Sequence, residues 1–325
     1  MKFELTEEQR GFGSALADLL SGAQVVPAAR SWAAGDTAAG LGLWKRLVDQ
    51  GVNALVVPEV AGGLGGTPVD LVVAFEQLGR FAVPGPWVES AAYLPALLAT
   101  AAPDVLEALA EGAVGSVLVE EHAPCALDAD VADHLYVVSS GAAVATGSVG
   151  AAHQSVDPVR RLFEVTAGDA VQASEDDVAR AFDLGALACS AQLLGLGEHL
   201  LATTVEYVKQ RKQFGRQIGS YQALKHALAD VRIALDFARP LVQGAAVTFG
   251  TDHRCQDVSA AKVAASEGAY RAARTALQLH GAIGYTEEHD LSLWLLKVRA
   301  LVSAWGTTAH HRDRLLTTIT GAVGG

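Results

Sequence analysis

The sequence predicts a mostly helical protein with a small β region near its middle. Apolar residues recur at helical spacing through roughly the first 110 residues and again from about residue 178 onward. Between these segments lie three short runs rich in β-branched and aromatic residues. We therefore expect an N-terminal helical domain (1–113), a reduced central β-domain (114–177) and a C-terminal four-helix-bundle domain (178–325).

The N-terminal domain is expected to consist of short helices. Thr6 followed three residues later by Gln9 is the pattern of a capping box ahead of the first helix. Further apolar residues at helical spacing predict a helix that ends at Gly51 and another that reaches Gly79.

The remaining elements follow from the same patterns. The three β-type runs at 115–119, 134–138 and 161–165 predict a sheet of four or five strands. Five helices are then expected: one long helix from about residue 178, one that includes Leu235 and is broken near Pro240, an Ala-rich helix from about Val258 to Gln278, one from Leu291 to about Leu301, and one after Gly306.

Charge excludes two classes of partner. The chain has 24 Lys and Arg against 36 Asp and Glu, a formal net charge of −12. A protein that binds nucleic acid or an anionic membrane surface needs a basic block to neutralise phosphates, and the sequence offers none. No uninterrupted apolar run reaches the roughly 20 residues of a membrane span. We therefore expect neither a nucleic acid nor a membrane as partner.

Cysteine and histidine usage points to a cytoplasmic protein without a metal. The cysteines Cys125, Cys189 and Cys255 form neither a CxxC pair nor an even set for disulfides, and the N-terminus shows no signal peptide. Adjacent residues such as His310 and His311 point about 100° apart on a helix, so they do not form a metal-binding pair. We expect reduced thiols and no metal site.

Three motifs carry most of the information about function. The first is Val-Pro-Glu at 57–59, followed by Gly-Gly-Leu-Gly at 62–65 and Phe-Glu-Gln-Leu-Gly-Arg at 75–80. The second is Arg-Lys-Gln-Phe-Gly-Arg-Gln-Ile at 211–218. The third is Gln-Leu-His-Gly-Ala-Ile-Gly-Tyr-Thr at 278–286, followed by Gly-Thr at 306–307. In this order and at this spacing they resemble the acyl-CoA dehydrogenase family. The resemblance covers roughly the first 110 and the last 145 residues.

The resemblance implies an FAD-dependent oxidoreductase. Enzymes of this family convert an acyl-CoA thioester into its trans-2-enoyl thioester: a carboxylate removes the α-proton while the β-hydride passes to the flavin. Because that proton is only weakly acidic, the carboxylate must be held within hydrogen-bond reach and desolvated. An acceptor of the electron-transfer-flavoprotein type is the implied electron partner.

The resemblance also implies FAD contacts across a subunit interface. The second and third motifs would reach the pyrophosphate and adenosine of a neighbouring subunit's FAD, with Arg211 paired to the pyrophosphate. Gln278 would donate an amide hydrogen bond, and Gly281 would let the backbone approach closely. The other residues implied at the cofactor site are Gln213, Phe214, Gly215, Gln222, Gly284 and Thr307.

Two departures from the family pattern affect the expected catalytic role. The usual catalytic Glu directly precedes the Gly-Thr pair, where this sequence has Trp305, and the alternative position on the first long C-terminal helix aligns with Gly185. An indole cannot accept the α-proton, and only Asp183 and Glu198 are weak candidates for a base nearby. The β-domain also lacks the turn and strand that cover the flavin ring in complete family members.

The departures favour a short subunit of a bacterial heteromer. We expect an α2β2 tetramer with a longer acyl-CoA dehydrogenase that carries the base, FAD shared at the interface, and a bulky, steroid-like CoA thioester as substrate. Two alternatives stay open: a flavin-free scaffolding subunit with the same fold, and a homodimeric enzyme whose base is Asp183, Glu198 or another acid. Arg211 could also be an ordinary surface cation near a helix C-terminus, Gln278 a buried amide and Trp305 a packing residue.

Overall fold

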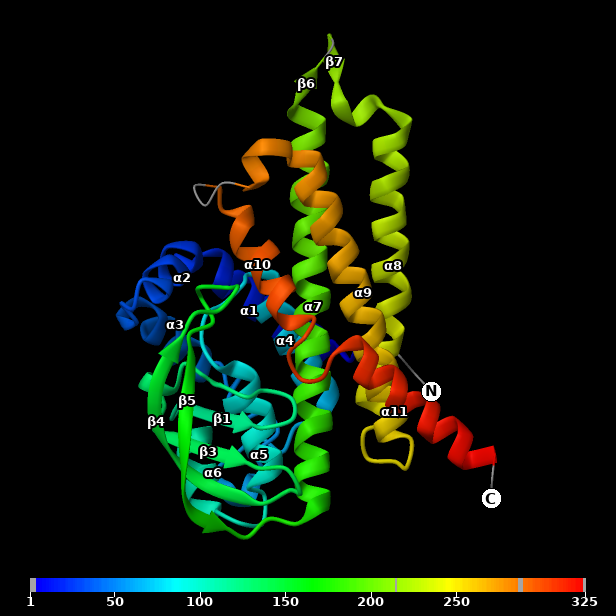
Figure 1. Cartoon of the computed structure of the whole chain (residues 1–325). Helices are drawn as coiled ribbons and strands as arrows, with labels where there is room; N and C mark the ends of the chain where they lie inside the picture. Colours follow the sequence, from blue (N-terminus) through cyan, green and yellow to red (C-terminus); the bar gives the residue numbers. More distant parts are fainter. Residues whose placement is uncertain (1–3, 214, 286–288, 324–325) are drawn as a thin grey trace.

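The computed structural model describes residues 4–213, 215–285 and 289–323 (Figure 1). Long helices run through most of its height, and a small sheet lies against one end of them together with short N-terminal helices. The order along the chain is helices, sheet, helices, as the sequence predicts.

The N-terminal helices are α1 (Glu7–Ser21), α2 (Val25–Ala33), α3 (Ala38–Val48), α4 (Pro68–Arg80), α5 (Leu94–Leu97) and α6 (Pro103–Ala110), with a 3₁₀ turn at Glu59–Ala61 and a π-helical turn at Glu89–Tyr93. The predicted capping box of α1 is present: the Gln9 amide donates to Thr6 Oγ1 at 3.1 Å, and the Thr6 amide donates to Gln9 Oε1 at 3.0 Å. α3 ends at Val48, before the predicted Gly51, while α4 ends one residue beyond Gly79.

The central sheet has five strands, β1 (Gly115–Val119), β2 (Ala126–Leu127), β3 (His134–Val138), β4 (Val144–His153) and β5 (Leu162–Val171), in the order β1-β3-β4-β5-β2. β1 and β3 are parallel and the other pairs are antiparallel. β4 is not among the three runs recognised in the sequence because Ala and Gly dominate it. Its pairing with β3 and β5 supplies the strand geometry that its own residues favour only weakly.

The C-terminal part consists of α7 (Glu175–Gln210), the short strands β6 (Lys212–Gln213) and β7 (Arg216–Gln217), α8 (Gln222–Val247), α9 (Arg254–His280), α10 (Leu291–Leu301) and α11 (Thr308–Val323). The predicted break near Pro240 is wrong, since α8 continues through this residue. Buried residues on both sides of it, Leu235 and Val242, anchor the helix in the core. Tertiary packing thus outweighs the loss of one backbone hydrogen bond at proline.

α7 forms the centre of the core. α4 and α7 touch backbone to backbone, because a Cβ on Gly195 would lie 1.9 Å from the Glu76 carbonyl oxygen and one on Gly79 would lie 2.1 Å from the Gln192 oxygen. By length and composition α7 could cross a membrane, although no uncharged run in it reaches 20 residues. The surrounding elements bury 89% of its apolar window, as is usual for a core helix. The helix begins at Glu175, three residues before the predicted domain boundary, and the division into three domains stays a prediction.

Candidate functional site

The second sequence motif forms the tip of the helical part. The β6–β7 hairpin joins α7 to α8 there (Figure 1). Gly215 in its turn has a φ of +79° and open space where a side chain would begin, a conformation that favours glycine. The Ile218 amide donates to the Arg211 carbonyl at 2.9 Å, so both ends of the hairpin are joined. The side chains of Arg211 and Gln213 are exposed, and Phe214 lies outside the described residues.

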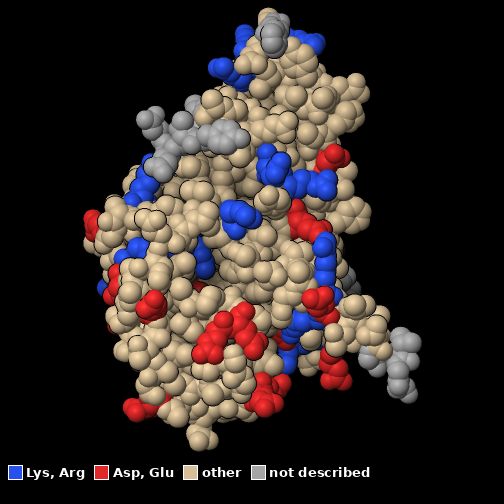
Figure 2. Space-filling model, viewed as in Figure 1, with Lys and Arg blue, Asp and Glu red and all other residues tan. Residues whose placement is uncertain are grey.

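This tip is basic although the chain as a whole is acidic. Residues 209–216 contain four Lys or Arg and no Asp or Glu. Figure 2 shows these basic side chains at the end of the molecule where Figure 1 places β6 and β7, with acidic groups gathered toward the opposite end. Lys209 pairs with Glu206 at 2.6 Å, but Arg211 has no ion-pair partner among the described residues. The tip therefore attracts anions.

The third motif meets the second in one cleft. α9 ends at His280, and Gly281 has a φ of +64° with open space around its Cα. Gln278, exposed on the last turn of α9, lines a cleft of about 490 Å³ together with Gly281, Arg211 and Gln213. The exposed guanidinium of Arg211 and the exposed side-chain amide of Gln278 thus line one cleft, together with accessible backbone of the β6–β7 hairpin and of the end of α9. Their exposure is incompatible with the alternative of a buried amide at Gln278.

Two residues that the sequence analysis did not single out hold these motifs together. The rings of Tyr207 on α7 and His280 on α9 stack at 4.2 Å between centroids. His280 Nδ1 lies 2.8 Å from the Ala276 carbonyl oxygen, an acceptor only, so Nδ1 carries the proton. Nε2 of the same ring is buried and lacks a partner among the described residues. The stack fixes the distance between the ends of α7 and α9.

A larger hollow of about 880 Å³ lies beside this cleft and also has Gln278 and Gly281 in its wall. α9 and α10 form it, with Arg274 and Arg299 among otherwise mostly apolar lining residues. The two hollows together offer an extended groove with cationic groups and little anionic character.

Four of the predicted cofactor residues do not line the cleft, the first being Gly215 in the hairpin turn. Gly284 is buried, and a Cβ there would lie 3.2 Å from Leu277 Cδ1, so its small size serves packing. Gln222 is exposed at the first position of α8. Thr307 lies near the start of α11, where its Oγ1 accepts a hydrogen bond from the His310 amide at 3.2 Å.

Trp305, which stands where the resemblance implies a catalytic carboxylate, is a buried indole. Trp305 is 1% exposed and has a φ of +55°. A Cβ on Gly185 would lie 2.9 Å from Trp305 Cε3, and the centroid of the Tyr93 ring lies 4.9 Å from that of the indole. Both sequence positions at which a base was sought therefore meet in one packed contact that contains no carboxylate.

The turn that carries Trp305 is held by buried polar groups. His311 Nε2 lies 2.8 Å from the Trp305 carbonyl oxygen, and Nδ1 lies 3.2 Å from Ser259 Oγ. Lys262 Nζ donates to the Leu301 carbonyl at 3.1 Å, which caps the last turn of α10. Burial lowers the pKa of His311 to about 3, so the ring is neutral and its Nε2 proton bonds the tryptophan carbonyl.

Asp183 is engaged in charge pairs. It is 1% exposed, and its two oxygens accept hydrogen bonds from Arg254 at 3.0 Å and from Arg314 at 2.7 Å. These bonds tie α7 to α9 and α11. Because both oxygens of this carboxylate are engaged by arginines, the geometry favours a structural role.

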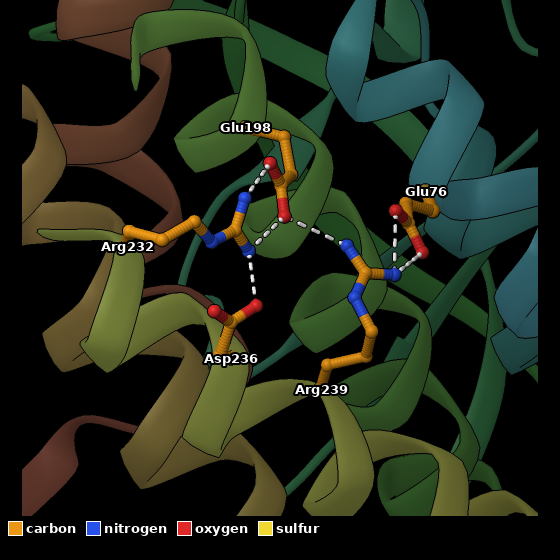
Figure 3. Close-up of polar contacts among 5 residues, drawn as sticks. All are labelled: Glu76, Glu198, Arg232, Asp236 and Arg239. Atoms are coloured by element: carbon orange, nitrogen blue, oxygen red, sulfur yellow. Dashed lines mark hydrogen bonds and ion pairs between the residues drawn. The ribbon is translucent and has the colours of Figure 1, made fainter. Parts of the chain in front are cut away.

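Glu198 lies in a network that joins three helices (Figure 3). Arg232 donates to both of its oxygens at 2.8 and 2.7 Å, and Arg239 bridges Glu198 at 2.9 Å and Glu76 at 2.7 Å. Burial alone would raise the pKa of Glu198, but the two arginines outweigh it and hold the pKa below its usual value. A weakened base in an ion-pair network across three helices is unsuited to remove a weakly acidic proton.

Sequence reasoning missed another carboxyl close to Trp305. Glu89, in the π-helical turn, is 3% exposed and lines a cavity of about 370 Å³ with Trp305 and Ser303. Burial raises its pKa, against the opposing charge of Arg160. Oε2 of Glu89 has no hydrogen-bond partner among the described residues. The sequence around Glu89 has no metal-ligand spacing that would single out this residue. The described residues contain no cluster of three or more potential metal ligands.

Comparison with known proteins agrees with this geometry. Residues 6–135 match the N-terminal domain of acyl-CoA dehydrogenases, and residues 176–319 match the C-terminal domain. The acyl-CoA dehydrogenase IpdE2 of Mycobacterium tuberculosis is 35% identical over 295 residues, which is 89% of this chain and 90% of that protein.

Solved structures show the same fold. A variant of the Tcur3481-Tcur3483 steroid ACAD superposes with a TM-score of 0.84 at 21% identity over 98% of this chain and 99% of the other. The ChsE4-ChsE5 complex from Mycobacterium tuberculosis gives 0.83 at 21% identity over 98% and 99%. The chain belongs to the acyl-CoA dehydrogenase family, a family of oxidoreductases whose members generally bind FAD. The predicted helical, β and helical architecture is thereby confirmed.

The cleft at the tip fits the phosphate end of a dinucleotide. Arg211 offers a planar cationic donor, and Gly281 in the wall of the cleft has a positive φ and open space in place of a side chain, as does Gly215 in the nearby hairpin turn. Backbone amides at such positions approach a pyrophosphate without obstruction.

Proposed function

We propose that this chain is a subunit of an FAD-dependent acyl-CoA dehydrogenase that contributes to an FAD site shared with a partner subunit. The shared cleft of Arg211 and Gln278 supports this most strongly. Both side chains are exposed at the tip of the molecule and point to a ligand outside the chain's own core. When bound, FAD would accept the hydride in the α,β-dehydrogenation of an acyl-CoA to its trans-2-enoyl thioester.

The roles of the individual residues follow from their chemistry. Arg211 would form paired, charge-assisted hydrogen bonds with the pyrophosphate, and Gln278 would donate an amide hydrogen bond beside it. Gln213 and Gly281 would line the path of the phosphates and Gly215 would shape the hairpin turn beside it, while the Tyr207 and His280 stack would keep both halves of the cleft in register. Gln222, Gly284 and Thr307 would act at most from outside this cleft.

The contact between Trp305 and Gly185 supports dependence on a partner. With an indole against the glycine, the chain offers no carboxylate at either usual position, so the base would come from a longer acyl-CoA dehydrogenase subunit in an α2β2 tetramer. The names of two similar structures refer to paired chains, ChsE4 with ChsE5 and Tcur3481 with Tcur3483, which is consistent with a heteromer. The word steroid in one of those names agrees with a bulky, steroid-like CoA thioester as substrate and a role in lipid or steroid catabolism. The cytoplasm remains the proposed compartment.

The experiment is coexpression with a longer acyl-CoA dehydrogenase partner, followed by measurement of flavin absorbance per complex and of acyl-CoA oxidation with an artificial acceptor. Arg211→Ala combined with Gln278→Ala is expected to lower FAD retention at least 10-fold while the complex still assembles. Lys209→Ala is the matched control, since this cation lies on the same helix end but pairs with Glu206. Unchanged flavin content in the double variant would favour the flavin-free scaffold instead.

Glu89 supports a second candidate, a homodimeric enzyme with its own base. Burial raises the pKa of the Glu89 carboxyl, whereas the pKa of Glu198 is lowered, and Oε2 of Glu89 has no hydrogen-bond partner among the described residues. If the chain purified alone contains flavin and oxidises acyl-CoA, and Glu89→Gln abolishes that activity with flavin retained, this second candidate replaces the heteromer.

A further inference from the structure

The outer face of α8 is apolar and exposed. Ile233, Phe237 and Leu241 are 52%, 73% and 44% exposed, and Val247 at the end of the helix is 42% exposed. The first three lie four residues apart and therefore form one ridge along the helix. Figure 1 shows α8 at the edge of the helical bundle, so this ridge points away from α7 and α9.

The inner face of the same stretch is apolar as well. Leu235, Ala238, Val242 and Ala245 are buried in the core of the chain. A helix that is apolar on both sides is normally buried on both sides, because large apolar groups in water cost free energy. A row of exposed apolar side chains with Phe237 at its centre marks a contact with another protein.

The charged groups beside this ridge are paired within the chain. Between positions 233 and 247 the charged residues are Asp236 and Arg239. Asp236 pairs with Arg232 at 2.6 Å, and Arg239 pairs with Glu76 at 2.7 Å. The ridge therefore offers a charged partner no unpaired group of opposite sign among the described residues. Two copies of a chain with a net charge of −12 repel each other, and a neutral face is where their approach is least opposed.

The spacing of the ridge makes it complementary to itself. Ile233 and Leu241 lie four residues before and after Phe237. If a second α8 lies antiparallel across a two-fold axis beside Phe237, the two phenylalanines meet, and each Ile233 faces the Leu241 of the other copy. Ridges of this i, i+4 kind interdigitate in the commonest class of helix packing. An interface of this symmetric kind needs no second surface evolved to match it.

We propose that the apolar ridge of α8 binds a second copy of this chain across a two-fold axis beside Phe237. The inference rests on the proposed α2β2 assembly and adds which subunits meet at this face. The ridge joins like subunits, whereas the cleft of Arg211 and Gln278 faces the longer subunit.

The first test measures the mass of the coexpressed complex by light scattering after gel filtration. Phe237→Glu places a charge at the centre of the ridge and is expected to weaken association of like subunits at least 10-fold, which leaves one copy of each subunit per particle. Val60→Glu is the matched control, because Val60 is 99% exposed on a turn of the N-terminal domain, and it should leave the mass unchanged. An unchanged mass for Phe237→Glu overturns the proposal.

The second test maps the two-fold axis with a short bis-maleimide cross-linker, with the wild-type chain as the background for its native cysteines. Phe237→Cys is expected to yield dimers of this chain. Ile233→Cys mixed with Leu241→Cys is expected to yield more dimer than either variant alone. Cross-links from Phe237→Cys to the longer subunit would assign the ridge to the unlike partner and overturn the proposal.

Flavin content separates this inference from the proposed function. Phe237→Glu should halve the mass of the complex and keep its flavin per chain. Arg211→Ala combined with Gln278→Ala should lower flavin content and keep the mass. If the first variant halves the mass while the second keeps its flavin, the ridge is supported and the shared FAD site is not.

Discussion

The indole of Trp305 occupies the volume that a side chain at residue 185 would need, with 2.9 Å separating Trp305 Cε3 from a Cβ built on Gly185. The two residues lie on α7 and on the turn after α10, more than a hundred positions apart in the sequence. Each departs from the family pattern at a position where a catalytic base was sought. Their contact means that the two departures are coupled: the glycine makes room for the ring.

This coupling predicts a double-mutant cycle. Gly185→Ala is expected to destabilise the wild-type chain by about 1–3 kcal/mol through overpacking. Trp305→Ala alone is expected to destabilise it by about 3–5 kcal/mol through the cavity it leaves. In the Trp305→Ala background, Gly185→Ala should instead stabilise by about 1 kcal/mol, as alanine does in a helix. Urea unfolding measures all four states, and additive effects would show that the two sites are independent.

The network of Figure 3 predicts a structural effect for Glu198. Glu198→Gln is expected to lower the free energy of unfolding by about 1–3 kcal/mol, because Arg232 and Arg239 would lose their shared partner. Glu206→Gln, which breaks the exposed pair with Lys209, should change it by less than about 1 kcal/mol. Flavin-dependent turnover of the folded complex should not change in either variant. Loss of turnover without loss of stability in Glu198→Gln would assign the base to this residue.

The stack between Tyr207 and His280 predicts a positioning effect on cofactor retention. Tyr207→Leu is expected to weaken FAD retention by the complex about 3- to 10-fold, because the ends of α7 and α9 lose the aromatic contact that sets their separation. Tyr207→Phe keeps the ring and should retain wild-type flavin content. The measurement is the ratio of flavin to protein absorbance after gel filtration. Equal loss in both variants would trace the effect to the hydroxyl and contradict a role for stacking.

The buried histidines predict how stability depends on pH. The folded-state pKa of His311 is about 3 and that of His199 about 4, both mainly because burial disfavours the charged ring, against about 6.5 in an unfolded chain. The unfolded state therefore binds protons that the folded state does not. Stability is fully present above pH 6.5 and falls as the pH drops from 6.5 toward 3 or 4.

His311→Gln should remove one group that binds a proton when the chain unfolds. The slope of unfolding free energy against pH should therefore fall by up to about 1.4 kcal/mol per pH unit between pH 4 and 6. The exposed His226→Gln on α8 is the control and should leave the slope as in the wild type. Denaturant unfolding at a series of pH values tests this. An unchanged slope for His311→Gln would mean that its ring is protonated in the folded state.

Local sequence signals predicted most elements well where they reinforced each other. The capping pair Thr6 and Gln9 marked the start of α1, and the stretch from Leu291 to Leu301 was assigned as a helix with the bounds that α10 has. Prediction failed where long-range contacts overrule local preference. α8 passes through Pro240 because Leu235 before it and Val242 after it are buried in the core, and β4 forms from alanine and glycine because two neighbouring strands pair with it.

The candidate site divides in the same way. The motifs around Arg211 and Gln278 were recognisable because each is a short string of residues, and a turn at Gly215 or Gly281 is a local property of the backbone. The stack of Tyr207 on His280 and the buried carboxyl of Glu89 beside Trp305 left no such signal. Each depends on residues brought together from separate elements, and a lone Tyr, His or Glu in a helix carries no mark of its distant neighbours.

The amino-acid sequence alone determined the helical, β and helical order, the family resemblance and the absence of a carboxylate before the Gly-Thr pair, since these depend on periodicity and on the identity of single positions. Only the tertiary structure decided that Trp305 packs against Gly185, that the arginines engage Asp183 and Glu198, and that Arg211 and Gln278 share one exposed cleft. The physical reason is distance: hydrogen bonds, packing and charge act over a few ångströms in space, and separation along the chain does not reveal which residues come that close.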